Sequence, residues 1–395
     1  MASFAATGVE IATMAALYLY SFALMQPLGG ALVDSWGPRK TVAAGAALMG
    51  GGALVFAASR TLSLAYFSRV LVGVGASVVF IGTLKVVSSW FRTREFATMS
   101  GLTQVAGHAG GLLASAPLTW TVGLVGWRAT FTGMAAISGV LALVTMLVVR
   151  DRPENAGHAP PSDGGHVPRT AAHAGASVSW REGFRVVWKN PRTWPMFFVF
   201  FLQYGSLLAF SGLWGVPFLR DVYRMSPAKA AGVVSAIPIG VMIGAPLIGI
   251  LSDRIERRRM PYFLFLAAYT AVWAVLALPA GGPPAAWLTP LCFLFGVTAT
   301  GFTLTWALAR EVNPPRYSGI ATATVNAGGF LGAAVLQNAV GKVLDGGWTG
   351  VIEAGARRYP PAAYHSAFML CFGVTALAAV LSLTVAETHG RTIAE

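Results

Sequence analysis

Long apolar segments separated by short polar turns run through the whole chain. Eleven of them are long enough to cross about 30 Å of hydrocarbon as a helix that rises about 1.5 Å per residue. Because no water is present in lipid to hydrogen bond an open backbone, each segment is predicted to be a transmembrane helix. The predicted spans cover residues 8–31, 41–59, 64–89, 97–121, 129–149, 194–219, 229–251, 261–280, 286–309, 317–341 and 364–386.

Composition supports this interpretation and excludes two classes of protein. Hydrophobic residues make up 55% of the 395 positions and charged residues only 11%, a balance that a soluble domain does not need. The net charge of +13 could indicate a nucleic-acid partner. However, the cations lie in short turns between apolar segments and not on one soluble face, so no nucleic-acid partner is expected.

One polar turn occurs twice. Each copy joins two apolar spans and combines glycine, leucine and aspartate with a short basic run. The first copy contains Gly30, Leu32, Asp34, Gly37, Arg39 and Lys40, and the second contains Gly249, Leu251, Asp253, Arg254 and the run 257–259. A turn that is repeated in this way predicts two related helical bundles.

This turn resembles the signature loop of the major facilitator superfamily of secondary transporters. The resemblance implies a 12-helix fold of two six-helix halves, with the loop between the second and third helices of each half. Only one span precedes Gly30, so the helix that would be missing is the first. We expect about 20 apolar residues to be encoded in frame upstream of Met1, and the alternative is a natural eleven-span variant. The resemblance also implies that Asp34 and Arg39 make polar contacts with the other half, near Ser318 and Gly319, and so steady one conformation.

The resulting organisation is an all-α integral membrane fold with five plus six helices. Residues 1–150 form the N-terminal bundle, residues 151–192 a cytoplasmic linker, and residues 193–395 the C-terminal six-helix bundle. The first part of the linker is rich in proline, glycine and histidine and cannot bury enough apolar surface to order itself. Its last part places Trp180, Phe184 and Trp188 at helical spacing, which predicts an interfacial helix.

The distribution of cations predicts the orientation. Most of the 28 lysines and arginines fall on the side of the signature turns, and short cytoplasmic loops carry the excess of positive charge. The turns and the C-terminus are therefore expected in the cytoplasm, in a multi-pass protein of the inner (plasma) membrane.

Few charged or titratable residues lie within the spans, and each is a functional candidate because charge in hydrocarbon is costly. Arg69 and Gly73 resemble an Arg-x-x-x-Gly motif of the family's fourth helix, where the arginine serves ion coupling or packing. Glu10 and His108 are the other coupling candidates. A rim position for Glu10, a packing role for His108 and an outward-reaching side chain for Lys85 remain open alternatives.

Polar stripes in the spans give the candidates for substrate binding. The resemblance implies that the first, fourth, seventh and tenth helices line the pathway, although these side chains could instead bond across helices. The candidate substrate-binding residues are Lys85, Gln203, Tyr204, Trp214, Thr298, Thr305 and Asn326.

These features predict a secondary transporter that works by alternating access. Two buried cations give the pathway a positive potential, which favours a small organic anion such as a carboxylate, with a co-transported proton or an exchanged anion. The alternatives are proton-coupled efflux of drugs or other amphipathic solutes, and a membrane sensor or scaffold that does not transport. The sequence contains neither a His-Glu-x-x-His nor a Gly-x-Ser-x-Gly motif, so we expect no enzyme activity, and also no cofactor or metal. We expect a monomer; the direction of transport stays open.

Overall fold

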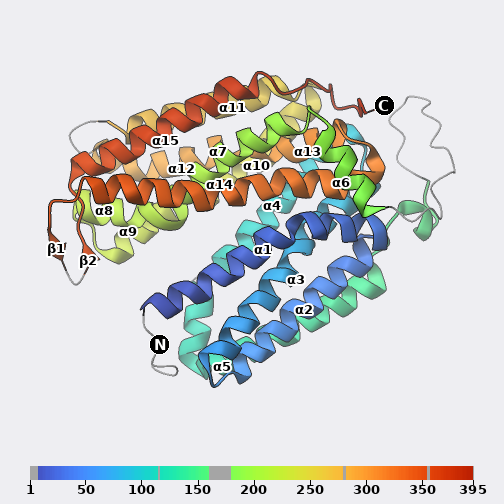
Figure 1. The fold of residues 1–395 in the computed structure, drawn as a ribbon, viewed down its shortest axis with the longest axis horizontal. Helices are drawn as coiled ribbons and strands as arrows, with labels where there is room; N and C mark the ends of the chain where they lie inside the picture. Colours follow the sequence, from blue (N-terminus) through green and yellow to red (C-terminus); the bar gives the residue numbers. More distant parts are fainter. Residues whose placement is uncertain (1–7, 114–115, 160–178, 279–281, 354–355, 395) are drawn as a thin grey trace. The chain divides into compact units, whose positions relative to one another are not determined.

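The computed structural model describes residues 8–113, 116–159, 179–278, 282–353 and 356–394 (Figure 1). Contacts between residues divide the chain into two compact units. Unit 1 comprises 1–93, 109–189 and 313–327, and unit 2 comprises 94–108, 190–312 and 328–395. The division into two bundles joined by a linker at residues 151–192, which was inferred from the sequence, stays a prediction.

The helices of unit 1 come mainly from the first part of the chain. They are α1 (Gly8–Trp36), α2 (Pro38–Ala58), α3 (Leu62–Trp90), α5 (Ala116–Val148), α6 (Trp180–Lys189) and the short 3₁₀ segments η2 (Pro153–Ala156) and η8 (Pro315–Tyr317). Three elements contribute residues to both units: η1 (Thr93–Glu95), α4 (Phe96–Leu113) and α14 (Ser318–Gly346).

The elements of unit 2 come from the second part of the chain. They are α7 (Trp194–Ala209), a π-helical segment η4 (Phe210–Trp214), α8 (Gly215–Tyr223), α9 (Pro227–Val234), α10 (Ala236–Arg254), α11 (Arg259–Leu276), η6 (Ala285–Trp287), α12 (Leu288–Ala299), η7 (Thr300–Phe302), α13 (Thr303–Glu311) and α15 (Pro361–Ser382). The two-residue strands β1 (Ile352–Glu353) and β2 (Ala356–Arg357) pair antiparallel.

The predicted all-α membrane fold is confirmed. Within the described ranges, nine helical stretches are long and apolar enough to cross a membrane. The other two predicted spans coincide with the helices α1 and α4. The fourth span, predicted over 97–121, coincides with α4 and the first part of α5, and residues 114–115 between them lie outside the described residues. Gly126, with φ of +80°, interrupts α5 before the next predicted span at 129–149.

Close helix contacts in unit 1 depend on glycine. Helix α3 packs against α1 and α2, and α2 also packs against α5 (Figure 1). A Cβ added at Gly75 would lie 2.6 Å from the carbonyl oxygen of Gly45, so α2 and α3 approach closely only because both positions lack a side chain. In lipid such small residues permit the backbone contact that drives helix association.

An aromatic cluster forms the core of unit 2. The ring of Phe210, in the π-helical segment, lies 5.9 Å from Trp273 of α11, 5.4 Å from Phe295 of α12 and 5.7 Å from Phe368 of α15. Tilted and edge-to-face pairs of this kind add roughly 0.5–1.5 kcal/mol each beyond their buried area. The cluster therefore fixes four helices of unit 2 around one point.

The predicted interfacial helix is present as α6. Its residue Val187 is fully buried, whereas Trp180 and Trp188 are each about half exposed. The indole N–H of Trp188 donates to Thr324 Oγ1 of α14 at 3.2 Å. Of the predicted linker, residues 160–178 lie outside the described residues.

Candidate functional site

The carboxylate of Asp34 connects three segments of unit 1. It lies at the end of α1, its side chain is 0% exposed, and it accepts a hydrogen bond from Lys85 Nζ of α3 at 2.6 Å. It also accepts from the backbone N–H groups of Gly319 at 3.0 Å and Ile320 at 2.9 Å, both in the first turn of α14. We call this set of contacts the Asp34 latch.

The local sequence explains why the latch forms. The first amides of a helix have no carbonyl partner within that helix, and together they carry partial positive charge. Asp34 supplies the missing acceptor for α14 from a different helix. The turn that follows is closed by Gly37, whose φ of +85° favours glycine, and a Cβ there would lie 2.9 Å from the carboxylate of Asp151.

Lys85 is part of the Asp34 latch. Besides Asp34, its ammonium donates to Ser318 Oγ at 2.7 Å and to the carbonyl oxygen of Pro315 at 3.3 Å. Its charge is therefore balanced by a buried carboxylate. This revises the sequence-based interpretation, in which Lys85 binds substrate and contributes an uncompensated charge.

Asn326 also connects α14 to α1 through a side-chain hydrogen bond. Its Nδ2 donates to Gln26 Oε1 of α1 at 3.0 Å, and both side chains are almost fully buried. Asn326 was predicted to bind substrate; here it bonds α14 to α1, about two helical turns beyond the latch. Gln26 was not singled out from the sequence, because one glutamine in an apolar segment gives no pattern.

The second copy of the turn repeats the arrangement inside unit 2. Asp253, at the end of α10, accepts from Thr98 N at 2.8 Å and from Thr98 Oγ1 at 2.6 Å, in the first turn of α4. Gly30 and Gly249 precede the two aspartates by the same four positions. A Cβ at Gly30 would lie 2.5 Å from Gly319 O, and one at Gly249 would lie 2.6 Å from Ala97 O. Each turn thus brings a glycine and an aspartate against the start of another helix.

A buried charge network surrounds Asp253. Arg258 donates to Asp253 Oδ1 at 2.5 Å and to Glu311 Oε1 of α13 at 2.9 Å, and the side chains of Arg258 and Glu311 are both 0% exposed. Thr388 Oγ1 donates to Glu311 as well. Burial lowers the pKa of Arg258, but the two carboxylates outweigh it and the pKa is raised overall.

The hydrogen bonds of Arg39 in the described part of the chain lie within unit 1. The backbone N–H of Arg39 donates to Asp151 Oδ1 at 2.7 Å, and its Nε donates to the carbonyl oxygen of Met146 at 2.8 Å. The guanidinium therefore stabilises the end of α5, where carbonyl groups are unpaired. Among the described residues Arg39 makes no hydrogen bond with the start of α14, and its contact with the other half stays a prediction. Lys40 and Arg254 are exposed, and Leu32 is partly buried in α1.

Arg69, the first coupling candidate, lies against aromatic rings of unit 1. Its guanidinium carbon is 4.5 Å from the ring centre of Phe56 and 5.7 Å from that of Phe131. Within the described part of the chain, Arg69 has no carboxylate partner. His108 is partly buried in α4, and Glu10 lies in α1 with a side chain outside the described set.

Gln203 and Tyr204 lie together in α7. Gln203 is fully buried, and its Nε2 donates to the carbonyl oxygen of Ala299 at 2.8 Å, where α12 changes to the 3₁₀ segment η7. Its Oε1 has no hydrogen-bond partner among the described residues. The ring of Tyr204 lies 5.2 Å from that of Phe302 and 5.5 Å from that of Phe330.

The other predicted binding residues each donate a hydrogen bond to a backbone carbonyl. Thr298 Oγ1 donates to Leu294 O at 2.8 Å, and Thr305 Oγ1 to Phe302 O at 2.5 Å, both within the same helical stretch. The indole N–H of Trp214 donates to Gln337 O of α14 at 3.1 Å. Gln203 and Tyr204 are neighbours in α7, whereas these three residues lie in other elements and make separate contacts.

The chain is similar to known proteins of one family. A family model described as Major Facilitator Superfamily matches residues 1–337. The chain is 24% identical over 335 residues to a probable sulfoacetate transporter, SauU, of Cupriavidus necator, covering 82% of this chain and 75% of that protein. It is 23% identical over 392 residues to a probable galactarate/D-glucarate transporter, GudP, of Escherichia coli, covering 93% and 82%.

A solved structure has the same fold. The proton:xylose symporter XylE, bound to 6-bromo-6-deoxy-D-glucose, superposes with a TM-score of 0.71 at 16% identity, over 96% of this chain and 87% of that one. At this identity the match concerns the fold alone.

Proposed function

Because the chain belongs to the major facilitator superfamily of secondary transporters, we propose that it carries a small organic anion such as a carboxylate across the bilayer by alternating access. The family and the relatives are transporters and not enzymes. In this proposal residues 1–150 and 193–395 are the two halves that rock, and the segment 151–192 joins them.

The Asp34 latch is the observation that carries this proposal. It joins α1 and α3, from the first half of the sequence, to the first turn of α14, from the second half. A transporter that opens alternately to each side has to break such a contact in one state and reform it in the other. The Asp34 carboxylate and the Lys85 ammonium act as the gate, with the bond between Gln26 and Asn326 as a second contact of the same gate.

Two observations support an anionic substrate. The relatives SauU and GudP are named for anions, sulfoacetate and galactarate/D-glucarate. In α3, Lys85 is balanced by Asp34, whereas Arg69 has no carboxylate partner in the described part of the chain. A positive charge in a low-dielectric surrounding attracts an anion over a distance, without needing to touch it. The free Oε1 of Gln203 would accept a hydrogen bond from a substrate hydroxyl, beside the ring of Tyr204.

Uptake of labelled carboxylates into proteoliposomes tests the substrate class. At about 8 Å and an effective dielectric constant of about 20, one unit charge contributes roughly 2 kcal/mol, so Arg69→Gln should raise the KM for anions about 30-fold. Arg69→Lys is the matched variant, because it keeps the charge and loses the planar stacking on Phe56. Equal losses in both variants would assign Arg69 to packing and remove this support for an anion.

Gln203→Leu should weaken uptake less than Arg69→Gln, because it removes one neutral hydrogen bond and no charge. Uptake of a carboxylate driven by an imposed pH gradient would support a co-transported proton, with His108 and Glu10 as the coupling residues. Expulsion of amphipathic cations together with no carboxylate uptake would favour drug efflux. No transport of any member of the panel, with intact binding, would favour the sensor.

The protein is a multi-pass membrane protein. We propose that it lies in the inner (plasma) membrane with its C-terminus in the cytoplasm. The cations near the signature turns support this orientation. We expect it to work as a monomer in the bilayer. A reporter fused after Glu395 that is active only in the cytoplasm checks the orientation.

A further inference from the structure

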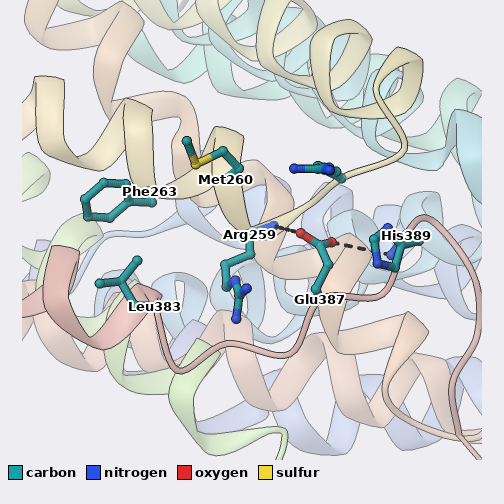
Figure 2. Close-up of a pocket in the computed structure, with 7 residues that line it drawn as sticks. Arg259, Met260, Phe263, Leu383, Glu387 and His389 are labelled. Carbon is teal, nitrogen blue, oxygen red and sulfur yellow. Dashed lines mark hydrogen bonds between the residues drawn. The ribbon is translucent and has the colours of Figure 1, made fainter.

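A surface cavity of about 590 Å³ lies in unit 2, where the start of α11 meets the segment that follows α15. Helices α11 and α15 run side by side (Figure 1). One part of the cavity wall is apolar and consists of Met260, Phe263 and Leu383. The other part is polar and consists of Arg257, Arg259, Glu387 and His389. Figure 2 shows Arg259 between the apolar residues and the pair Glu387 and His389.

The carboxylate of Glu387 in this wall is already hydrogen bonded within the protein. Glu387 accepts hydrogen bonds from four backbone amides, those of Arg258 at 2.7 Å, Arg259 at 3.2 Å, Thr388 at 3.1 Å and His389 at 3.4 Å. Its carboxylate thus closes the N-terminus of α11 and holds the chain after α15 in place. The bonds to Arg259 and His389 are visible in Figure 2.

The two arginines of the wall are available for a ligand. In the run 257–259 only Arg258 points inward, where Asp253 and Glu311 hold it. Arg257 and Arg259 are exposed, and among the described residues their guanidinium groups make no hydrogen bond or ion pair. Two guanidinium groups without an ion-pair partner among the described residues are suited to bind a phosphate, because arginine is a preferred ligand of that anion.

The position of the cavity identifies the source of that phosphate. One apolar span begins at Arg259 and the other ends at Ser382, so the cavity lies at the level where hydrocarbon changes to headgroups. Met260 and Leu383 are each 49% exposed, which leaves an apolar surface beside the arginines on the spans' own side. A soluble anion would use only the arginines, whereas a phospholipid would also cover the apolar residues.

We propose that this cavity binds an anionic phospholipid, with its phosphate between Arg257 and Arg259 and an acyl chain along Met260, Phe263 and Leu383. The lipid would fasten the start of α11 to the segment around Glu387, next to the buried Arg258 and Glu311. The site is separate from the Asp34 latch and from Gln203, and it does not depend on the identity of the substrate.

Binding of fluorescent phosphatidylglycerol to the purified protein in neutral detergent tests the site. Each arginine near an anionic headgroup contributes roughly fivefold in affinity, so the double variant Arg257→Gln/Arg259→Gln should bind about 25-fold more weakly. The matched control is Arg192→Gln/Arg391→Gln, which removes two exposed arginines of unit 2 outside the cavity and should keep the affinity. Equal losses of lipid affinity in both double variants would mean that general surface charge attracts the lipid, and would overturn the proposal.

Two further measurements separate the sources of phosphate and avoid dependence on the variants. Inorganic phosphate and phosphatidylcholine should compete poorly with the labelled lipid. If inorganic phosphate competed at the same concentration as the lipid, the ligand of the cavity would be a soluble anion and the lipid proposal would be overturned. A photoactivatable phosphatidylglycerol should crosslink the wild-type protein at 257–264 and 383–389. Crosslinks confined to other segments would overturn the site.

Discussion

Replacing Asp34 with Asn removes one negative charge from the centre of the latch and changes little in shape. The Asn side chain keeps one oxygen acceptor, but its NH₂ group must then face either the ammonium of Lys85 or an N–H of α14, donor against donor. Two contacts that are now 2.9 and 3.0 Å long, and the ion pair of 2.6 Å, cannot all be kept.

The magnitude follows from burial. Breaking a fully buried pair by removing one partner costs about 3–5 kcal/mol, and Lys85 is 17% exposed, so water compensates in part. We therefore expect Asp34→Asn to destabilise the latched state by about 2–3 kcal/mol, which lowers the population of that state relative to the open state roughly 30- to 150-fold. Transport should slow, because the cycle has to pass through the latched state.

Labelling of an introduced cysteine measures this shift. Thr322 is 4% exposed and lies three positions after Gly319 in α14, and Thr322→Cys is a small change. The native cysteines Cys292 and Cys371 are both buried, which keeps the background of a maleimide reagent low. Asp34→Asn should raise the labelling rate at position 322 at least tenfold. Asp151→Asn is the control, because Asp151, which follows α5, contacts the same turn through Arg39 and makes no hydrogen bond with α14 among the described residues. The gate would be refuted if Asp34→Asn left the labelling rate unchanged, or if Asp151→Asn raised it equally.

Glu311→Gln should lower the stability of the protein by about 3–5 kcal/mol, because it leaves Arg258 buried without full compensation, and a thermal unfolding scan should show a lower Tm. Glu353→Gln, which breaks the ion pair with Arg224 in which both side chains are 60% exposed, should lower Tm by no more than the equivalent of ~0.5 kcal/mol. Equal Tm shifts for Glu311→Gln and Glu353→Gln would contradict the role of burial. Gln26→Leu removes the hydrogen bond from Asn326 Nδ2 to Gln26 Oε1, so cysteine labelling near the latch should increase by roughly five- to tenfold. A labelling rate as low as that of the wild type would assign this contact to packing only.

The sequence alone determined the class of fold. Lipid requires every backbone group to be paired within a helix, so long apolar segments and their turns reveal the spans directly. The spacing of Gly30 and Asp34, repeated at Gly249 and Asp253, likewise indicated a duplicated structure. The structure contains both copies, each with its aspartate against the start of another helix.

The tertiary structure decided what each polar side chain contacts. Periodicity places a residue on a face of its own helix, but it carries no information about which distant segment covers that face. For this reason Lys85 could be read as a substrate ligand, although Asp34, 51 positions away, neutralises it. Thr298 and Thr305 could be read as a polar stripe, although each hydroxyl donates to a carbonyl of its own helical stretch.

The buried network around Arg258 shows the same limit from the other side. The run of three arginines is visible in the sequence, and an orientation signal explains all three equally well. Only the fold separates them, because Glu311 and Asp253 converge on the middle one and Arg257 and Arg259 are left at the surface. Charges in a membrane protein act through partners that are brought together by packing, and that pairing is a property of the three-dimensional arrangement and not of local spacing.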